Sequence, residues 1–332
     1  MTKVLMSVGR DVHRFFRPGK IDELKSLVDL TIRNGLANEE AVYSAAISDT
    51  QAEIVVTGWG SPLLTVKVME ENPQLKYMCH LTGGVRSNVS REVIENGLIV
   101  TNWGTLIGPT VAEAALLGML SSLRRTTQVT FDMHRDGGWK DAETRVESLL
   151  YQRVGLHGFG QVARSLVEML RPFQCEISAY DPYLPDEVFE AHGVKRVGDL
   201  KTLYAENYVI SIHAPKVDET YHNVNAEVLS GMQDGAVLVN TARGAVIDTE
   251  ALIAELKTGR IYASLDVYEQ EPLAKDSPLR GMMNCHLTYH TAGPTQDRIV
   301  DMGDLAVENV RRFINGEAVE HVVTVDQYDR MT

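Results

Sequence analysis

The sequence predicts an α/β protein with two doubly wound parallel-sheet domains, one inserted into the other. Three observations lead to this prediction. The chain of 332 residues is long enough for two domains of typical size. Short apolar, strand-like runs alternate with helix-like segments along most of it, which is typical of parallel sheets covered by helices. Residues 153–182 form a strand, a glycine turn, a helix and a second strand in register.

The first domain is expected to be discontinuous and flavodoxin-like. Its alternating segments are 4–8, 21–30, 54–57, 64–72, 76–81, 89–96 and 99–101. A final helix over 296–315 carries an apolar stripe and stops at Gly316. Because the inserted domain is complete before it, this helix is expected to return to the first domain. The predicted boundaries are 1–102 with 297–332 for the first domain and 103–296 for the second.

A long helix is predicted from Thr110 to about Arg135. Pro109 favours its start, and the run Asp136-Gly137-Gly138 favours its end. Its length would let it bridge two domains. Its apolar face is formed by Val111, Ala115, Gly118, Met119 and Leu123. That face is expected to pack against another domain or a second copy of the chain, and we expect a homodimer.

The strand, turn and helix over 153–182 carry the residues of a dinucleotide site. Gly158 would make the tight turn, and Gly160 would let backbone amides approach a pyrophosphate at the helix N-terminus. Asp181, which ends the second strand, would accept hydrogen bonds from ribose hydroxyls, and this favours NAD over NADP. The unit therefore predicts a Rossmann domain. His157 is expected to be a partly solvated residue under the turn.

The composition excludes several classes of partner. The formal net charge of −13 repels phosphate backbones, so nucleic acid is not expected to bind. Cys79, Cys175 and Cys285 lie far apart in apolar runs without CxxC spacing, so they are expected to be buried thiols and no metal site is expected. The apolar run at the N-terminus is too short for a signal peptide, and no segment reaches membrane-spanning length. A cytoplasmic protein without a membrane partner is expected.

Three strands of the second domain end in motifs that suit acid–base chemistry. The motifs are NTARG (240–244), DVYEQEP (266–272) and TYHTAG (288–293). Because the carboxyl ends of parallel strands meet at one edge of a sheet, these motifs should supply a guanidinium, a carboxylate and an imidazole to one site. Hydride transfer involving a 2-hydroxy acid needs a guanidinium to grip the carboxylate, an imidazole to carry the hydroxyl proton and a carboxylate to orient the imidazole. Each of these side chains alone could equally be a surface residue.

From about Lys76 to Arg298 these motifs resemble the D-isomer-specific 2-hydroxyacid dehydrogenases. The resemblance implies an NAD-dependent dehydrogenase (EC 1.1.1.-) that transfers a hydride between nicotinamide and a D-2-hydroxy acid or 2-oxo acid. In that family the arginine of the ARG motif, the glutamate of the EP motif and the histidine of the PH motif are catalytic. The resemblance therefore implies catalytic roles for Arg243, Glu271 and His290. Glu269 is the nearby acid without that role.

The same resemblance implies the binding residues. NAD is expected to contact Gly158, Gly160, Gln161, Val162, Asp181, Pro215, Thr241, Asp266 and Gly293. The substrate carboxylate is expected to meet Arg243 and the backbone amides of Gly84 and Val85, with Arg86 beside them. Two positions depart from the family pattern: Tyr289 stands where proline usually precedes the catalytic histidine, and the usual GVGxDNID-like loop is replaced by GGVRSNVS.

The substrate itself is not determined by these motifs, which suit glyoxylate, phosphoglycerate or a larger sugar acid. Loops at the carboxyl ends of first-domain strands contain Trp59 and several arginines, namely Arg10, Arg14, Arg17 and Arg86. Guanidiniums beyond Arg243 favour a longer substrate with a second polar or anionic end. The alternative is that these arginines point into solvent.

One alternative function belongs to a different class of protein. A transcriptional corepressor on the same fold would bind NAD as a redox sensor, bind a peptide partner in the first domain, and often keep the three catalytic side chains. The absence of disordered tails argues against it. Turnover of 2-oxo acids with NADH would distinguish an enzyme from such a sensor.

Overall fold

The computed structural model describes residues 1–9, 11–141 and 144–331, and these form two compact units. The first unit comprises 1–106 and 295–332, and the second comprises 107–294. The boundaries expected from the sequence, after residue 102 and before residue 297, lie a few residues from these limits. Among the described residues, no helix combines the length and the apolar character that crossing a membrane requires.

The first unit is a parallel sheet in the order β2-β1-β3-β4-β5, which is the flavodoxin-like order, as predicted. Its strands are β1 (Lys3–Ser7), β2 (Asp29–Ile32), β3 (Ile54–Thr57), β4 (Tyr77–His80) and β5 (Ile99–Thr101). Its helices are η1 (Val12–Phe15), α1 (Lys20–Leu27), α2 (Glu40–Thr50), α3 (Val66–Glu71), α4 (Arg91–Glu95), α12 (Val300–Ile314) and α13 (Val325–Arg330). The central strands are buried on both faces because helices cover both sides of the sheet.

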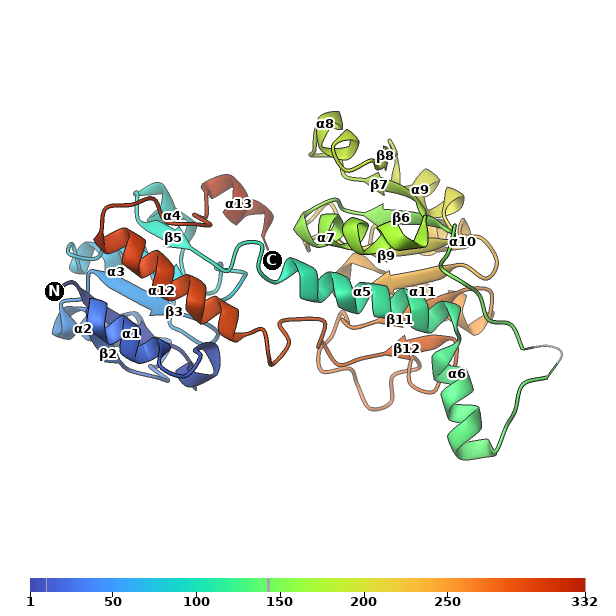
Figure 1. The fold of residues 1–332 in the computed structure, drawn as a ribbon, viewed down its shortest axis with the longest axis horizontal. Coiled ribbons are helices and arrows are strands. Elements are labelled where there is room, and N and C mark those ends of the chain that lie inside the picture. The colour runs from blue at the N-terminus through green and yellow to red at the C-terminus, as the bar shows by residue number, and fades with distance from the viewer. Residues whose placement is uncertain (10, 142–143, 332) are drawn as a thin grey trace. The chain divides into compact units, whose positions relative to one another are not determined.

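The two faces of this sheet have separate cores. Helices α1 and α12 lie side by side on one face (Figure 1). Met302 and Val310 of α12 belong to the same buried cluster as Val4 and Met6 of β1. The final helix therefore returns to the first unit, as the sequence predicted. Helices α2, α3 and α4 cover the other face, where Ile47 is fully buried.

The second unit is a parallel sheet in the order β12-β11-β10-β9-β6-β7-β8, which contains the Rossmann strand order, as predicted. Its strands are β6 (Arg153–His157), β7 (Glu176–Tyr180), β8 (Lys195–Arg196), β9 (Val209–Ile212), β10 (Val237–Asn240), β11 (Tyr262–Leu265) and β12 (Cys285–Leu287). Its helices are α5 (Gly108–Leu123), α6 (Thr126–Phe131), η2 (Asp132–Asp136), α7 (Gln161–Leu170), η3 (Arg171–Phe173), α8 (Asp186–Glu190), α9 (Leu200–Glu206), α10 (Ala226–Ser230), η4 (Gly244–Val246) and α11 (Thr249–Lys257).

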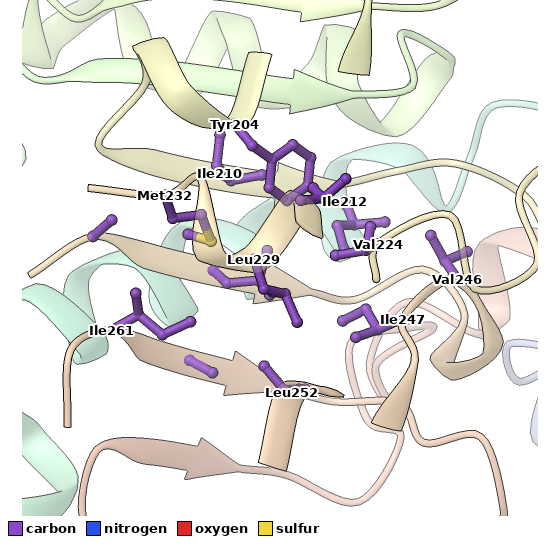
Figure 2. Close-up of a cluster of buried hydrophobic side chains, with 14 of the residues drawn as sticks. Tyr204, Ile210, Ile212, Val224, Leu229, Met232, Val246, Ile247, Leu252 and Ile261 are labelled. Carbon is purple, nitrogen blue, oxygen red and sulfur yellow. The ribbon is translucent and has the colours of Figure 1, made fainter. Parts of the chain in front are cut away.

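Apolar side chains fill both faces of this sheet as well. On one face, Tyr204 of α9, Leu229 of α10 and Leu252 of α11 pack against Ile210 and Ile212 of β9 (Figure 2). On the other face, α5 and α7 pack on the strands and on each other. Both cores lie beneath the carboxyl edge of the sheet, so they hold the loops at that edge on a rigid base.

The helix predicted from 110 to about 135 is interrupted, so this prediction was wrong. Helix α5 ends at Leu123, and Arg125 has a left-handed φ of 54° before α6 begins. The buried guanidinium of Arg125 lies 3.1 Å from the centroid of the Tyr262 ring and donates to the carbonyl of Ser122 at 2.9 Å. The apolar face of α5 packs on its own sheet, where a Cβ on Gly118 would lie 2.7 Å from Ser264 Oγ.

Other differences lie in the first unit and at the end of β6. The segment predicted over 21–30 divides into α1 and β2, and the sequence did not indicate α2 or α13. His157 is 2% exposed, whereas partial solvation was expected. Its Nδ1 lies 3.2 Å from the hydroxyl of Tyr204. His80 is equally buried, with Thr57 Oγ1 2.8 Å from its Nδ1.

The two buried histidines predict a stability that falls in acid. Burial lowers the pKa of His157 and of His80 to about 3 from the ordinary 6.5, and His213 adds to the effect at His157. Below pH 6.5 the unfolded chain therefore binds protons that the folded chain does not. The free energy of unfolding should decrease, by at most about 1.4 kcal/mol per pH unit for each histidine, as the pH falls from 6.5 towards 3.

Urea unfolding at a series of pH values between 7 and 4 measures this dependence. His157→Gln should reduce its slope, because one of the imidazoles whose pKa burial lowers is gone. His134→Gln, at an exposed position of η2, is the matched control. Equal slopes in His157→Gln and the unmodified protein would contradict the assignment.

Candidate active site

The glycine turn of the second unit lies where its strand order reverses, between β6 and β9. Gly158 has a φ of 92°, and a Cβ there would lie 2.8 Å from the backbone nitrogen of Ala214. Only glycine combines that conformation with such a close approach of two loops. Reversal points of this kind are where doubly wound sheets bind ligands.

The first turn of α7 follows immediately and has the features of a phosphate site. Gly160 is its N-cap residue, and no side chain caps the helix. The backbone amides of Gln161 and Val162 are thus available at the positive end of the helix dipole. A Cβ on Gly160 would meet no atom within 4 Å, so there is open space above this turn.

Asp181 follows β7 and joins the two strands of the unit. Its Oδ2 accepts a hydrogen bond from the Phe159 amide at 2.9 Å, and its Oδ1 accepts one from the Tyr183 amide at 3.0 Å. Each carboxylate oxygen can accept a further hydrogen bond. Asp181 can therefore brace the glycine turn and still accept from two ribose hydroxyls.

The loop after β10 is held by Asn240, a role that the sequence reasoning missed. Its Oδ1 accepts from the Ala242 amide at 3.0 Å, and its Nδ2 donates to the carbonyl of Arg243, also at 3.0 Å. Asn240 is fully buried. Next to it, the buried Thr241 Oγ1 has no hydrogen-bond partner within the described part of the chain. A buried polar atom without a partner is costly unless a ligand satisfies it.

Arg243 and Glu271 come close because the loops after β10 and β11 touch. Gly244 packs against the backbone of Tyr268 so closely that any Cβ would clash with it. The Arg243 guanidinium is half-buried and donates to the carbonyl of Ala242 at 2.7 Å. Burial lowers the pKa of Arg243, and the charge of Glu271 acts in the opposite direction.

Asp266 holds the loop that carries His290. Its Oδ1 accepts from the Thr288 hydroxyl at 2.6 Å and from the Thr291 amide at 2.8 Å. Its Oδ2 accepts from the Ala292 amide at 2.8 Å, and its carbonyl accepts from the His290 amide at the same distance. His290 has a left-handed φ of 58°. Sequence reasoning gave Asp266 a cofactor contact, and the structure adds this loop-holding role.

His290 and Glu271 form a direct pair at this edge. Nδ1 of His290 lies 2.7 Å from Oε2 of Glu271, while Oε1 of Glu271 accepts from the Tyr268 amide at 3.0 Å. Because a carboxylate can only accept, Nδ1 carries the proton that is shared in this hydrogen bond. Nε2 of His290 is then the atom available to take up or give a proton.

Gly293 and Pro215 are the remaining expected cofactor residues. A Cβ on Gly293 would lie 2.9 Å from Thr110 Oγ1, so the loop after His290 rests on the start of α5. Pro215 follows β9, and its carbonyl accepts from the Thr220 hydroxyl at 2.6 Å. Both residues therefore lie in loops at the carboxyl edge of the sheet.

Glu269, the nearby acid, forms hydrogen bonds with His222 and Thr249. Its Oε1 lies 2.8 Å from Nε2 of His222, and its Oε2 accepts from the Thr249 hydroxyl at 3.0 Å. This pair resembles the His290–Glu271 pair in chemistry. The charge of Glu271, by contrast, acts on Arg243.

The expected substrate residues Gly84, Val85 and Arg86 lie in the first unit, in the loop after β4. The Val85 amide donates to the thioether sulfur of Met331 at 3.4 Å. Arg86 donates to the carbonyl of Tyr328 at 2.9 Å and to that of Asp329. Its guanidinium thus holds α13 against the loop. The capping box Thr324-x-x-Gln327 is a sequence signal that could have predicted the start of this helix.

The described groups of the second unit fit a dinucleotide. The open space above Gly160, the uncapped amides of α7 and the unpartnered hydroxyl of Thr241 are features that the protein alone leaves unsatisfied. The pyrophosphate of a dinucleotide would accept from the amides of α7, and the carboxamide on its nicotinamide ring would pair with the Thr241 hydroxyl. Gly158, Gly160, Gln161, Val162, Asp181 and Thr241 are the residues that would hold it.

Comparison with known proteins agrees with this geometry. Residues 116–292 match the family described as D-isomer specific 2-hydroxyacid dehydrogenase, NAD binding domain. The chain is 31% identical over 303 residues to D-3-phosphoglycerate dehydrogenase of Methanocaldococcus jannaschii, covering 91% of this chain and 56% of that protein. It is 31% identical over 268 residues to glyoxylate reductase of Thermococcus litoralis, covering 78% of this chain and 80% of that protein.

A solved structure shows the same fold. The crystal structure of a glyoxylate reductase from Paecilomyes thermophila superposes with a TM-score of 0.80 at 24% identity, covering 97% of this chain and 98% of that one. The chain spans about half the length of the M. jannaschii relative and most of the length of the other two. The chain therefore belongs to the D-isomer specific 2-hydroxyacid dehydrogenase family, and its second unit contains the NAD-binding domain of that family.

Proposed function

We propose that this protein catalyses the NAD-dependent interconversion of a 2-oxo acid and the corresponding D-2-hydroxy acid. The observation that carries the proposal is the His290–Glu271 pair, with 2.7 Å between Nδ1 and Oε2, beside the half-buried Arg243. NADH, when bound, supplies the hydride that reduces C2 of the substrate. The overall reaction consumes one 2-oxo acid, one NADH and one proton.

The side chains of the second unit provide the remaining chemistry. Arg243 binds the substrate carboxylate and polarises the oxygen on C2, since a guanidinium offers parallel donors to a carboxylate. In reduction, Nε2 of His290 gives its proton to that oxygen. In oxidation, the same atom takes the hydroxyl proton. Glu271 keeps Nδ1 protonated, so that only Nε2 changes its protonation during the reaction.

The loop after β4 has a separate role. The family resemblance assigns the amides of Gly84 and Val85 to the substrate carboxylate. The Val85 amide donates to the Met331 sulfur in the structure, and a thioether is a weak acceptor. A carboxylate forms stronger, charge-assisted bonds and would replace it.

Corepressor function receives no comparable support. The relatives described above are named as a dehydrogenase and reductases.

We further propose a homodimer that resides in the cytoplasm. Helix α6, η2 and the residues as far as 141 extend away from the sheet of the second unit (Figure 1). Val129, Met133 and Trp139 on this arm are exposed, with Trp139 77% accessible. Apolar side chains gathered in this way favour burial against a second copy. The free thiols of Cys79, Cys175 and Cys285 suit a reducing compartment.

The catalytic proposal is tested by His290→Ala. Loss of the proton carrier should lower kcat for reduction of 2-oxo acids by a factor of about 10² to 10⁴. The affinity for NADH, measured by fluorescence titration, should change little, because the glycine turn is untouched. His222→Ala is the matched control, since it removes a histidine from the similar pair with Glu269. Equal losses in both variants would contradict the proposal.

The cofactor preference is tested at Asp181. Its carboxylate should repel a 2′-phosphate, so kcat/KM should be higher with NADH than with NADPH. Asp181→Ser should reduce that ratio on the order of tenfold or more, because one like-charge repulsion is removed. Asp186→Ser, at a nearby exposed acid paired with Arg196, is the control. Comparable kcat/KM for the two cofactors in the unmodified enzyme would refute the assignment.

The dimer is tested by sedimentation equilibrium. The expected mass is twice the 36.8 kDa of the chain. The double variant Met133→Asp, Trp139→Ser should dissociate at protein concentrations where the unmodified protein does not, because a charge would replace buried apolar surface. A monomeric unmodified protein at tens of micromolar would end this proposal.

A further inference from the structure

The first unit has its own reversal of strand order, between β1 and β3. The loops that follow these strands meet there: the Gly9 amide donates to the Trp59 carbonyl at 3.0 Å. A Cβ on Gly9 would lie 2.6 Å from the same oxygen. Open α/β sheets bind ligands at the carboxyl edge beside such a reversal. Trp59 and η1 therefore stand where the first sheet is best suited to bind a small molecule.

Aromatic rings connect this position to the glycine loop after β4. The Trp103 indole lies directly against Gly83, where no side chain would fit. Its ring centroid is 6.2 Å from that of Trp59, in an edge-to-face arrangement. Trp59 in turn lies 5.6 Å from Phe15, measured between ring centroids. Phe15 is buried, whereas Trp59 is 44% exposed, so Trp59 presents ring surface at the edge.

Arg14 lies over this aromatic surface. Its Cζ is 5.4 Å from the centroid of Trp59 and 5.5 Å from that of Phe15. Stacking on aromatic rings holds a guanidinium in place through its face, and the N–H groups around its edge remain able to donate. Among the described residues, no carboxylate forms an ion pair with Arg14.

The other arginines proposed from the sequence for this purpose differ from Arg14. Arg17 pairs with Asp301 and Asp304 of α12. Arg86 donates to backbone carbonyls of α13. Arg10 lies outside the described residues. Arg14 is thus the arginine of this group whose position is fixed and whose charge the described residues leave unpaired.

We propose that Arg14, resting on Trp59, binds an anionic group at the far end of the substrate. This inference rests on the proposed function, in which the amides of Gly84 and Val85 bind the C1 carboxylate. Trp103 lies against Gly83 of the same loop, and Trp59 contacts both Trp103 and Arg14, so the chain of an acid held there that runs along these rings would bring its far end to Arg14. The favoured substrate is therefore a 2-oxo acid with a carboxylate or phosphate at its other end, and glyoxylate is too short to use the subsite.

Matched pairs of substrates test this proposal. The pair 2-oxoglutarate and 2-oxopentanoate have the same number of carbons and differ in a terminal carboxylate. The pair phosphohydroxypyruvate and hydroxypyruvate differ in a phosphate. The unmodified enzyme should have the higher kcat/KM for the member with the second anionic group in at least one pair, and that pair identifies carboxylate or phosphate as the group bound.

Arg14→Gln should lower kcat/KM for the preferred anionic substrate by about 10- to 100-fold, the range for losing a hydrogen-bonded charge partner. For the partner that has only the C1 carboxylate the change should stay within about threefold. Trp59→Leu should lower the same preference, because the guanidinium loses the ring that positions it. Arg17→Gln removes the same charge from the same loop and is the control, since Arg17 is paired with α12.

Two results would overturn the subsite. One is an unmodified enzyme that does not favour the member with a second anionic group in either pair. The other is an Arg14→Gln variant that loses no more discrimination than Arg17→Gln. In either case reduction of the acids that have only the C1 carboxylate would leave the proposed function standing. An enzyme that reduces no 2-oxo acid would overturn the proposed function and the subsite together.

Discussion

The position of His290 depends on one buried carboxylate. Asp266 is 4% exposed and accepts hydrogen bonds from Thr288, Thr291 and Ala292 through its side chain and from His290 through its carbonyl. His290 has the left-handed conformation, which costs about 1–2 kcal/mol for a residue with a Cβ. Hydrogen bonds to a charged group, each contributing about 1.5–3 kcal/mol, outweigh that cost. Without Asp266 the loop would relax, and the pair with Glu271 would lose its geometry.

In the neighbouring loop, too, a buried polar residue holds the backbone while more exposed side chains face the site. Asn240 is fully buried and fixes the loop of Arg243, while the side chains of His290 and Glu271 are 48% and 35% exposed. Groups that exchange protons must be accessible to the substrate. An exposed side chain, however, has rotational freedom, which makes its position less well defined. Buried polar residues at the strand ends remove that freedom from the backbone, because breaking their hydrogen bonds would leave unsatisfied polar atoms. The side chains proposed as catalytic can therefore be accessible and still be positioned.

Prediction from sequence succeeded where the information is local. Helix α7 and strand β7 are the helix and second strand predicted within 153–182, because periodicity and glycine chemistry act within a few residues. The three strand-end motifs indicated a common edge because parallel strands align their carboxyl ends. The break at Arg125 was missed, since it depends on the Tyr262 ring more than a hundred residues away. The partners of Arg17 and Arg86 lie near the other end of the chain, and no local pattern contains them.

Net charge says little about how this protein would hold anions. A chain of net charge −13 repels an anionic acid at long range, but salt screens that repulsion beyond about 8 Å at physiological ionic strength. Recognition must then come from nearby groups. Arg243 is half-buried, and burial lowers its pKa because its charge is poorly solvated. In the proposed function, the substrate carboxylate would interact with this charge in place of water. The Arg14 guanidinium is exposed and hydrated, and binding of an anion would displace this water. Arg243 should therefore supply most of the affinity for the acid, and Arg14 should act mainly on the choice between acids.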